Sequence, residues 1–177
     1  MLFETLSQET VYQGRAFNVR RDKVRLPNQR NMHVDVIEHP GAVTILPVND
    51  EGQILFVRQY RHAAGRELLE LPAGTLEADE PPQTCAAREV REETGFAAEQ
   101  VLMLGEFFLA PGYSTEYMVV YLATGLRHDP LPKDKDEFIT LQAIPIDQAY
   151  AMALGGELMD GKSLAALLLA RPYLQKG

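Results

Sequence analysis

Three glutamates near the middle of the chain constrain it most. Glu89, Glu92 and Glu93 follow one another at spacings of three and one, so on an α-helix they fall within about a 100° arc. Like charges placed in this way repel one another by roughly a few tenths of a kcal/mol per pair. A cation held against the stripe would remove that cost. Ligands that are all oxygen favour a hard divalent ion, Mg²⁺ first and Mn²⁺ as the alternative.

The alternative is an ordinary acidic surface whose charges pair with Arg88 and Arg91. The flanking residues argue against it. Gly74 precedes an acidic loop that ends at Glu80, and Gly95 follows the stripe at the position where a helix end needs a residue with positive φ. The segment therefore predicts a loop–helix–loop platform for a metal ion.

The order of these residues resembles the signature of the Nudix hydrolases. The pattern is Gly, five residues, Glu, seven residues, then Arg-Glu-apolar-x-Glu-Glu-x-Gly-apolar. It spans 23 residues and is matched at Gly74, Glu80, Arg88, Glu89, Val90, Glu92, Glu93, Gly95 and Phe96. The resemblance implies an α/β fold, an α/β/α sandwich around a mixed sheet, and hydrolysis of a nucleoside diphosphate linked to a further group.

The motif carries the expected metal ligands. Glu89 and Glu93 lie one helical turn apart and are the first choice as bridging ligands, with Glu92 completing the set. By resemblance, the backbone carbonyl of Ala73, in the turn before the motif, is a further ligand. We count Glu92 among the catalytic residues as well.

Two other charged residues of the motif have supporting roles. Arg88 shares a helix face with Glu92, so we expect it to orient the carboxylates. Glu80 either binds metal or braces the loop, and the second role is favoured.

The general base is expected outside the motif. The family often supplies it from a loop, and the acidic stretch 134–137 is the candidate. Glu137 is the first choice, with Asp136 and Asp134 as alternatives. The alternative is that residues 134–137 form only a polar loop without a catalytic role.

A second resemblance concerns the substrate. Pro111 lies sixteen residues after Gly95, and residues 110–116 resemble the Ser-Pro-Gly-x-x-x-Glu loop of ADP-ribose pyrophosphatases, with Ala110 in place of serine. This implies that Pro111 and Gly112 shape the substrate site and that Glu116 hydrogen-bonds the terminal ribose. The alternative is a simple turn, because Pro-Gly is a strong turn signal.

Other substrate contacts are expected from the same comparison. The Gln-Tyr-Arg sequence ending at Arg61 resembles a strand that contacts the diphosphate, and a guanidinium fork suits phosphate. Arg58 and Arg61 point to opposite faces of a strand, and Arg61 is favoured. Glu70 reaches substrate or metal. Phe17 either stacks on adenine or belongs to the core.

The hydrophobic pattern indicates mixed strands and helices. We expect a hairpin at 9–26, strands at 32–38, 42–48, 53–60, 68–71, 101–108, 117–123 and 138–144, and helices at 146–154 and 161–174. Residues 1–40 are expected to form a small antiparallel sheet, and 41–177 the hydrolase domain. Such a sheet is marginal alone, so we expect it to pack on a second copy of the chain in a homodimer. The resemblance to the ADP-ribose pyrophosphatases implies that the sheet crosses to the partner and that Phe17 stacks on the partner's adenine.

Composition excludes several classes of function. The net charge is −8 without a dense basic stripe, which disfavours nucleic acid as a partner. The longest apolar run, 164–170, is too short to cross a bilayer. Cys85 is the only cysteine and the first residues do not resemble a signal peptide, so a cytoplasmic enzyme is expected.

The leading hypothesis is a Mg²⁺-dependent ADP-ribose pyrophosphatase that forms AMP and ribose 5-phosphate. The nearest alternative keeps the chemistry and changes the substrate to a nucleotide-sugar of the GDP-mannose type or to a dinucleotide. A non-catalytic nucleotide sensor is a third interpretation, but such a protein typically loses the glutamates or gains a DNA-binding segment.

Overall fold

The computed structural model describes residues 2–132 and 138–174 and divides into two compact units. The first unit contains residues 1–41 and 108–117. The second contains residues 42–107 and 118–177.

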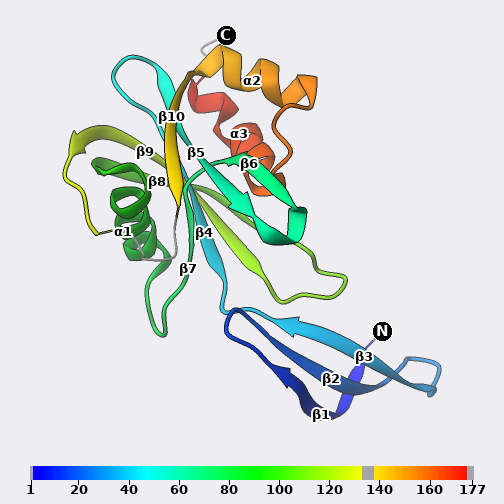
Figure 1. Cartoon of the computed structure of the whole chain (residues 1–177). Helices are drawn as coiled ribbons and strands as arrows, with labels where there is room; N and C mark the ends of the chain where they lie inside the picture. Colours follow the sequence, from blue (N-terminus) through cyan, green and yellow to red (C-terminus); the bar gives the residue numbers. More distant parts are fainter. Residues whose placement is uncertain (1, 133–137, 175–177) are drawn as a thin grey trace. The chain divides into compact units, whose positions relative to one another are not determined.

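The first unit is a three-stranded antiparallel sheet in the order β1-β2-β3 (Figure 1). Its strands are β1 (Glu4–Gln13), β2 (Asn18–Arg25) and β3 (Asn31–Glu38). The predicted hairpin is present, but β1 begins five residues earlier than residue 9. The reason is that β1 pairs with β2 as far as the last residue of β2. There Arg25 lies opposite Glu4 and donates a 2.7 Å hydrogen bond to its carboxylate.

Segment 108–117 joins this unit through backbone hydrogen bonds. The amide of Ile37 donates to the carbonyl of Tyr113 at 2.8 Å, and the amide of Thr115 donates to the carbonyl of Ile37 at 2.9 Å. The hydroxyl of Thr115 accepts from the amide of His39. The loop that carries Pro111 is therefore held against β3.

The second unit contains two sheets. One has the order β7-β4-β9-β8, and the other has the order β10-β5-β6. The bounds are β4 (Ala42–Pro47), β5 (Gln53–Arg61), β6 (Arg66–Glu70), β7 (Ala73–Thr75), β8 (Phe96–Phe108), β9 (Tyr117–His128) and β10 (Ile139–Pro145), with a 3-10 turn η1 (His62–Ala64) between β5 and β6. Strand β4 is parallel to β9 and antiparallel to β7, so the larger sheet is mixed, as expected.

The expected strands of this unit are present, with differences at their ends. Strand β8 begins at Phe96 and β9 extends to His128, both beyond the expected bounds. The rings of Phe96 and His128, at these two strand ends, pack edge to face with their centroids 5.8 Å apart. The short strand β7 was not expected, because three residues carry no periodic signal.

Three helices complete the second unit: α1 (Pro82–Thr94), α2 (Ile146–Gly155) and α3 (Gly161–Leu174). Both α1 and α3 pack on β4, and Figure 1 shows them on either side of that strand. All six residues of β4 are buried, which explains its continuous apolar run. This confirms the α/β/α arrangement.

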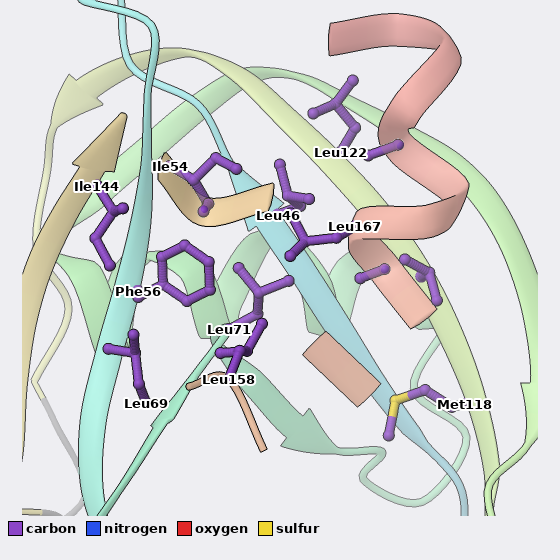
Figure 2. Close-up of a cluster of buried hydrophobic side chains, with 14 of the residues drawn as sticks. Leu46, Ile54, Phe56, Leu69, Leu71, Met118, Leu122, Ile144, Leu158 and Leu167 are labelled. Atoms are coloured by element: carbon purple, nitrogen blue, oxygen red, sulfur yellow. The ribbon is translucent and has the colours of Figure 1, made fainter. Parts of the chain in front are cut away.

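The main core lies between β4, β5, β9 and the two C-terminal helices. Figure 2 shows its side chains pointing toward one another, with Phe56 from β5, Leu46 from β4 and Leu167 from α3 among them. Leu71 and Leu69 join the same cluster, so the chain leading into the motif is anchored in the core. None of the helices in the described residues is long and apolar enough to cross a membrane.

Candidate active site

A pocket of about 300 Å³ lies in the second unit, where β5 ends and β7 leads into α1. Three types of group line it: carboxylates, arginines and the backbone of β7. The lining residues are Arg61, Ala73, Gly74, Thr75, Glu77, Arg88, Glu89 and Glu92. The structure thus brings together six residues singled out from the sequence and adds Thr75 and Glu77.

Helix α1 forms where the motif predicts it. Pro82 occupies its first turn, where a missing N–H costs little. Val90 and Ala86 are fully buried on its apolar side. The helix ends at Thr94 and is capped by Gly95, which has φ 82° and donates its N–H to the carbonyl of Arg91 at 3.0 Å. This confirms the left-handed C′ glycine that was expected there.

Two of the three glutamates of the stripe are buried. Glu89 is 7% exposed and Glu93 is 3% exposed. The amide of Ala73 donates to Glu93 Oε2 at 3.2 Å, which ties the helix to β7. A Cβ atom on Gly74 would lie 1.8 Å from Glu89 Oε1, so only glycine lets this carboxylate lie against the strand. The glycine of the motif is therefore a steric requirement.

Arg88 connects the acidic residues around the pocket. Its Nη1 donates to Glu89 at 2.7 Å and to Glu92 at 2.9 Å, and its Nε and Nη2 donate to Glu80 at 3.1 and 3.0 Å. These contacts raise the pKa of Arg88, with the hydrogen bond to Glu80 as the largest cause. A single guanidinium thus holds three carboxylates in place, which supports the orienting role expected for Arg88.

Glu80 braces the loop in front of α1. Besides Arg88, it accepts a 3.1 Å hydrogen bond from the backbone amide of Glu77. The hydrogen bonds from Arg88 lower the pKa of Glu80 to about 2, despite an opposing effect of burial. Within the described residues, these contacts tie the loop to Arg88 of α1, which agrees with the favoured one of its two expected roles.

The donor set at the pocket suits a hard cation. Glu89, Glu92 and the backbone of Ala73 line the same pocket, and Glu93 is bonded to the Ala73 amide. These are the oxygen ligands that Mg²⁺ takes in proteins. Within the described residues, no three His, Cys, Asp or Glu side chains are already gathered as a metal cage. Arg88 and the β7 backbone instead hold the carboxylates.

Arg61 and Arg58 are separated as their spacing predicts. Arg61 lines the pocket, whereas Arg58 donates to Gln142 of β10 at 3.3 Å. Glu70 is not among the lining residues: it is 2% exposed and accepts two 2.8 Å hydrogen bonds from Arg61 and one from Lys162. Burial acts to raise the pKa of Glu70, but these partners hold it below its usual range.

Four predicted substrate residues belong to the first unit. Phe17 is 43% exposed and packs near the ring of Tyr12 at 6.3 Å, so it is not a core residue. Pro111 and Gly112 line a pocket of about 330 Å³ together with residues of β3. Glu116 closes the loop through its carbonyl, which accepts from the amide of Leu109. Their contact with substrate stays a prediction.

The predicted base, Glu137, and its alternatives, Asp136 and Asp134, lie outside the described residues. The described chain on either side of them belongs to the second unit. The amide of Leu131 donates to the carbonyl of Arg91 at the end of α1, and Ile139 pairs with Gln59, two residues before Arg61.

Three polar residues near the start of α3 were missed. Asp160, Lys162 and Ser163 form a buried network with Glu70. The sequence Asp-Gly-Lys-Ser carried a signal that could have found part of it. Asp160 is a preferred N-cap residue, and it accepts a 3.1 Å hydrogen bond from the amide of Ser163 three positions later.

Replacing Glu80 by Gln should lower the free energy of unfolding at neutral pH. Because the folded pKa is depressed, the stability from this carboxylate is present above its ordinary pKa of 4.5 and is lost as the pH falls toward about 2. Denaturant unfolding from neutral pH to about pH 2 should therefore show a weaker acid dependence for Glu80→Gln. The control is Asp79→Asn, which removes an exposed carboxylate of the same loop. Equal acid dependence of Glu80→Gln and the parent would contradict the bracing role.

Comparison with known proteins agrees with this geometry. A family model described as NUDIX domain matches residues 38–167, and one described as Nucleoside diphosphate sugar hydrolase N-terminal domain matches residues 3–31. A solved structure described as an ADP compounds hydrolase superposes with a TM-score of 0.87. It covers 98% of this chain and 95% of its own at 24% identity, which shows the fold.

Curated relatives are similar over most of their length. The ADP-ribose pyrophosphatase of Mycobacterium tuberculosis is 45% identical over 94% of this chain and 82% of its own, and that of Bacillus subtilis is 33% identical over 97% and 92%. A GDP-mannose pyrophosphatase from an Enterobacter species is 36% identical over 80% of this chain and 76% of its own. The chain therefore belongs to the Nudix family and is a Nudix hydrolase.

Proposed function

We propose that this enzyme hydrolyses the diphosphate bond of ADP-ribose, with Mg²⁺, to AMP and ribose 5-phosphate. One observation carries the proposal: the pocket places Arg61 beside the acidic stripe of α1. Hydrolysis of a diphosphate needs a positively charged side chain that binds the phosphate oxygens and carboxylates that hold a metal ion against them. Relatives named as ADP-ribose pyrophosphatases, at 45% and 33% identity, support this choice of substrate.

The metal would be held by Glu89, Glu92 and Glu93 together with the carbonyl of Ala73. A bound Mg²⁺, or Mn²⁺, offsets the charge of the diphosphate and acidifies a bound water. The chain's own part is to hold the carboxylates. Arg88 fixes Glu89 and Glu92, and the bare backbone of Gly74 leaves room for Glu89.

The choice of ADP-ribose over other substrates rests on the first unit. The loop of Pro111, Gly112 and Glu116 would recognise the terminal ribose, and exposed Phe17 would stack on adenine. The alternative is a nucleotide-sugar of the GDP-mannose type. The Enterobacter relative supports it, and that relative matches a smaller share of the chain. Both alternatives use the same pocket chemistry.

Glu137 is our proposed general base. Ile139, two residues further along the chain, pairs with Gln59 of the strand that carries Arg61. A carboxylate that takes a proton from the attacking water would complete the set of groups needed for hydrolysis.

Incubation with a panel of substrates tests the activity. With Mg²⁺, the parent enzyme should convert ADP-ribose to AMP and ribose 5-phosphate with a higher kcat/KM than it shows for GDP-mannose or dinucleotides. Glu93→Gln should abolish turnover without unfolding the protein, because it removes a ligand charge and relieves repulsion on α1. Products should be identified by chromatography and the fold checked by circular dichroism.

Two outcomes would contradict the proposal. Preference for GDP-mannose would assign the alternative substrate, and near-normal turnover of Glu93→Gln at saturating Mg²⁺ would remove the metal platform. Glu99→Gln is the matched control, because Glu99 is an exposed glutamate of β8 outside the pocket.

Glu137→Gln should lower kcat by roughly a hundredfold or more and leave KM little changed, as expected for a lost base. Steady-state kinetics on the substrate identified above measures both constants. Asp136→Asn and Asp134→Asn are the neighbouring controls. If none of the three variants loses activity, the base lies on α1 instead.

We also propose a homodimer in which the first unit contacts a second copy. Nine of the ten residues of β1 are exposed, and within the described part of this sheet only Asp22 and Val24 are buried. The unit also exposes large apolar side chains: Leu2, Phe3, Val11, Tyr12, Phe17 and Met32. A sheet with so little core is marginal in water unless another surface covers it.

Light scattering at micromolar concentration should give about twice the chain mass of 19.8 kDa. Val11→Glu should shift the protein toward the monomer, because it places a charge on the apolar surface of β1. Leu154→Glu, at a residue 91% exposed on α2, should leave the dimer intact. A parent mass near that of one chain would refute the dimer.

A further inference from the structure

A buried ion network lies behind the pocket, between β6 and the start of α3. Lys162 is only 8% exposed and donates hydrogen bonds to Glu70 and, at 2.9 Å, to Asp160. Glu70 is 2% exposed. Taking such charges out of water is costly unless their partners are well placed, so this arrangement calls for an explanation.

Helix capping does not explain Lys162. The first turn of a helix carries partial positive charge and favours anions, and Asp160 satisfies that preference by accepting from the amide of Ser163. A lysine at the second position of α3 opposes the same field. Its ammonium is held there by Glu70, which belongs to β6 and not to the helix.

The same turn is attached to the chain that enters the motif. The hydroxyl of Ser163 donates to Asp160 and accepts a 2.7 Å hydrogen bond from the buried amide of Leu71. Leu71 is 1% exposed and part of the core. Figure 2 shows its side chain among those of the core cluster. Lys162 is thus placed by a rigid part of the protein.

Glu70 transmits this placement to the pocket. Its two carboxylate oxygens accept from Nε and Nη2 of Arg61, each at 2.8 Å. A two-point contact of this kind fixes the plane of the guanidinium as well as its position. Neither of these two contacts uses the Nη1 atom of Arg61. Within residues 2–132 and 138–174, the N–H groups of Nη1 therefore remain for a ligand in the pocket that Arg61 lines.

We propose that Lys162 is a positioning residue for Arg61. By bonding Glu70 Oε2, it holds the carboxylate in the one orientation that presents the Arg61 guanidinium to the diphosphate. Without Lys162, Glu70 and Asp160 would lose the cation that bonds both of them, and Oε2 of Glu70 would lose one of its two charged donors, the other being Arg61. The inference rests on the proposed function to the extent that Arg61 binds the diphosphate.

Kinetics on Lys162→Met provides the first test. KM for ADP-ribose should rise about tenfold, the size of one weakened charge-assisted hydrogen bond, with kcat within about twofold of the parent. The reason is that Arg61 binds the diphosphate equally in the ground and transition states. A defect of folding alone would lower the active fraction, and therefore kcat, and would leave KM unchanged. Arg171→Met, which removes an exposed charge from the same helix, is the matched control and should match the parent.

A double-mutant cycle tests whether Lys162 acts through Arg61. In the background of Arg61→Ala, the further change Lys162→Met should leave KM unchanged to within about twofold, because the group it positions is already missing. Lys162→Arg keeps the charge and should restore most of the affinity. Additive effects of the two changes on KM would overturn the proposal.

A measurement without substrate separates this inference from the proposed function. The Nε–H signal of Arg61, assigned by its loss in Arg61→Ala, should exchange slowly with water in the parent and at least about tenfold faster in Lys162→Met. If Lys162→Met does not fold, Lys162→Gln serves with the same expected direction. An unchanged exchange rate in the folded variant would overturn the proposal. Faster exchange in an enzyme that does not hydrolyse ADP-ribose would refute the substrate and support the positioning role.

Discussion

The concentration of negative charge on one face of α1 is the constraint on which the rest of the site depends. Glu89 and Glu93 are buried, so their charges must be compensated inside the protein. Arg88 provides part of this by bonding Glu89, Glu92 and Glu80. The hydrogen bonds from Arg88 thus hold the carboxylates in fixed orientations, as metal ligands require.

Arg61, a charged residue on the β5 side of the pocket, is also held by an ion network, but through one more residue than the carboxylates of α1. Arg88 holds carboxylates directly, whereas Arg61 is itself held by the carboxylate of Glu70, with Lys162 behind it. Both networks are attached to the chain around β7, through Ala73 on one side and Leu71 on the other. The relative placement of acidic and basic groups therefore depends on a short segment packed between α1 and α3.

The chain around the motif was predictable because its signals are local. Gly95 ends α1 through a backbone conformation that glycine adopts easily, and the spacing of the glutamates alone places them on one face. The continuous apolar run of β4 likewise indicated a strand buried on both sides. Strand β7 escaped prediction because its three residues are set by pairing with β4, a contact distant in sequence.

The sequence by itself determined the family, the helix that carries the acidic stripe and the separation of Arg58 from Arg61, because each follows from spacing along one element. Only the tertiary structure decided the pairing of Glu70 with Lys162, which are 92 residues apart and meet at the start of α3. It also decided why Gly74 is glycine, since the atom that excludes a side chain belongs to Glu89 on another element. Burial and contact between distant segments set these roles, and no local pattern records them.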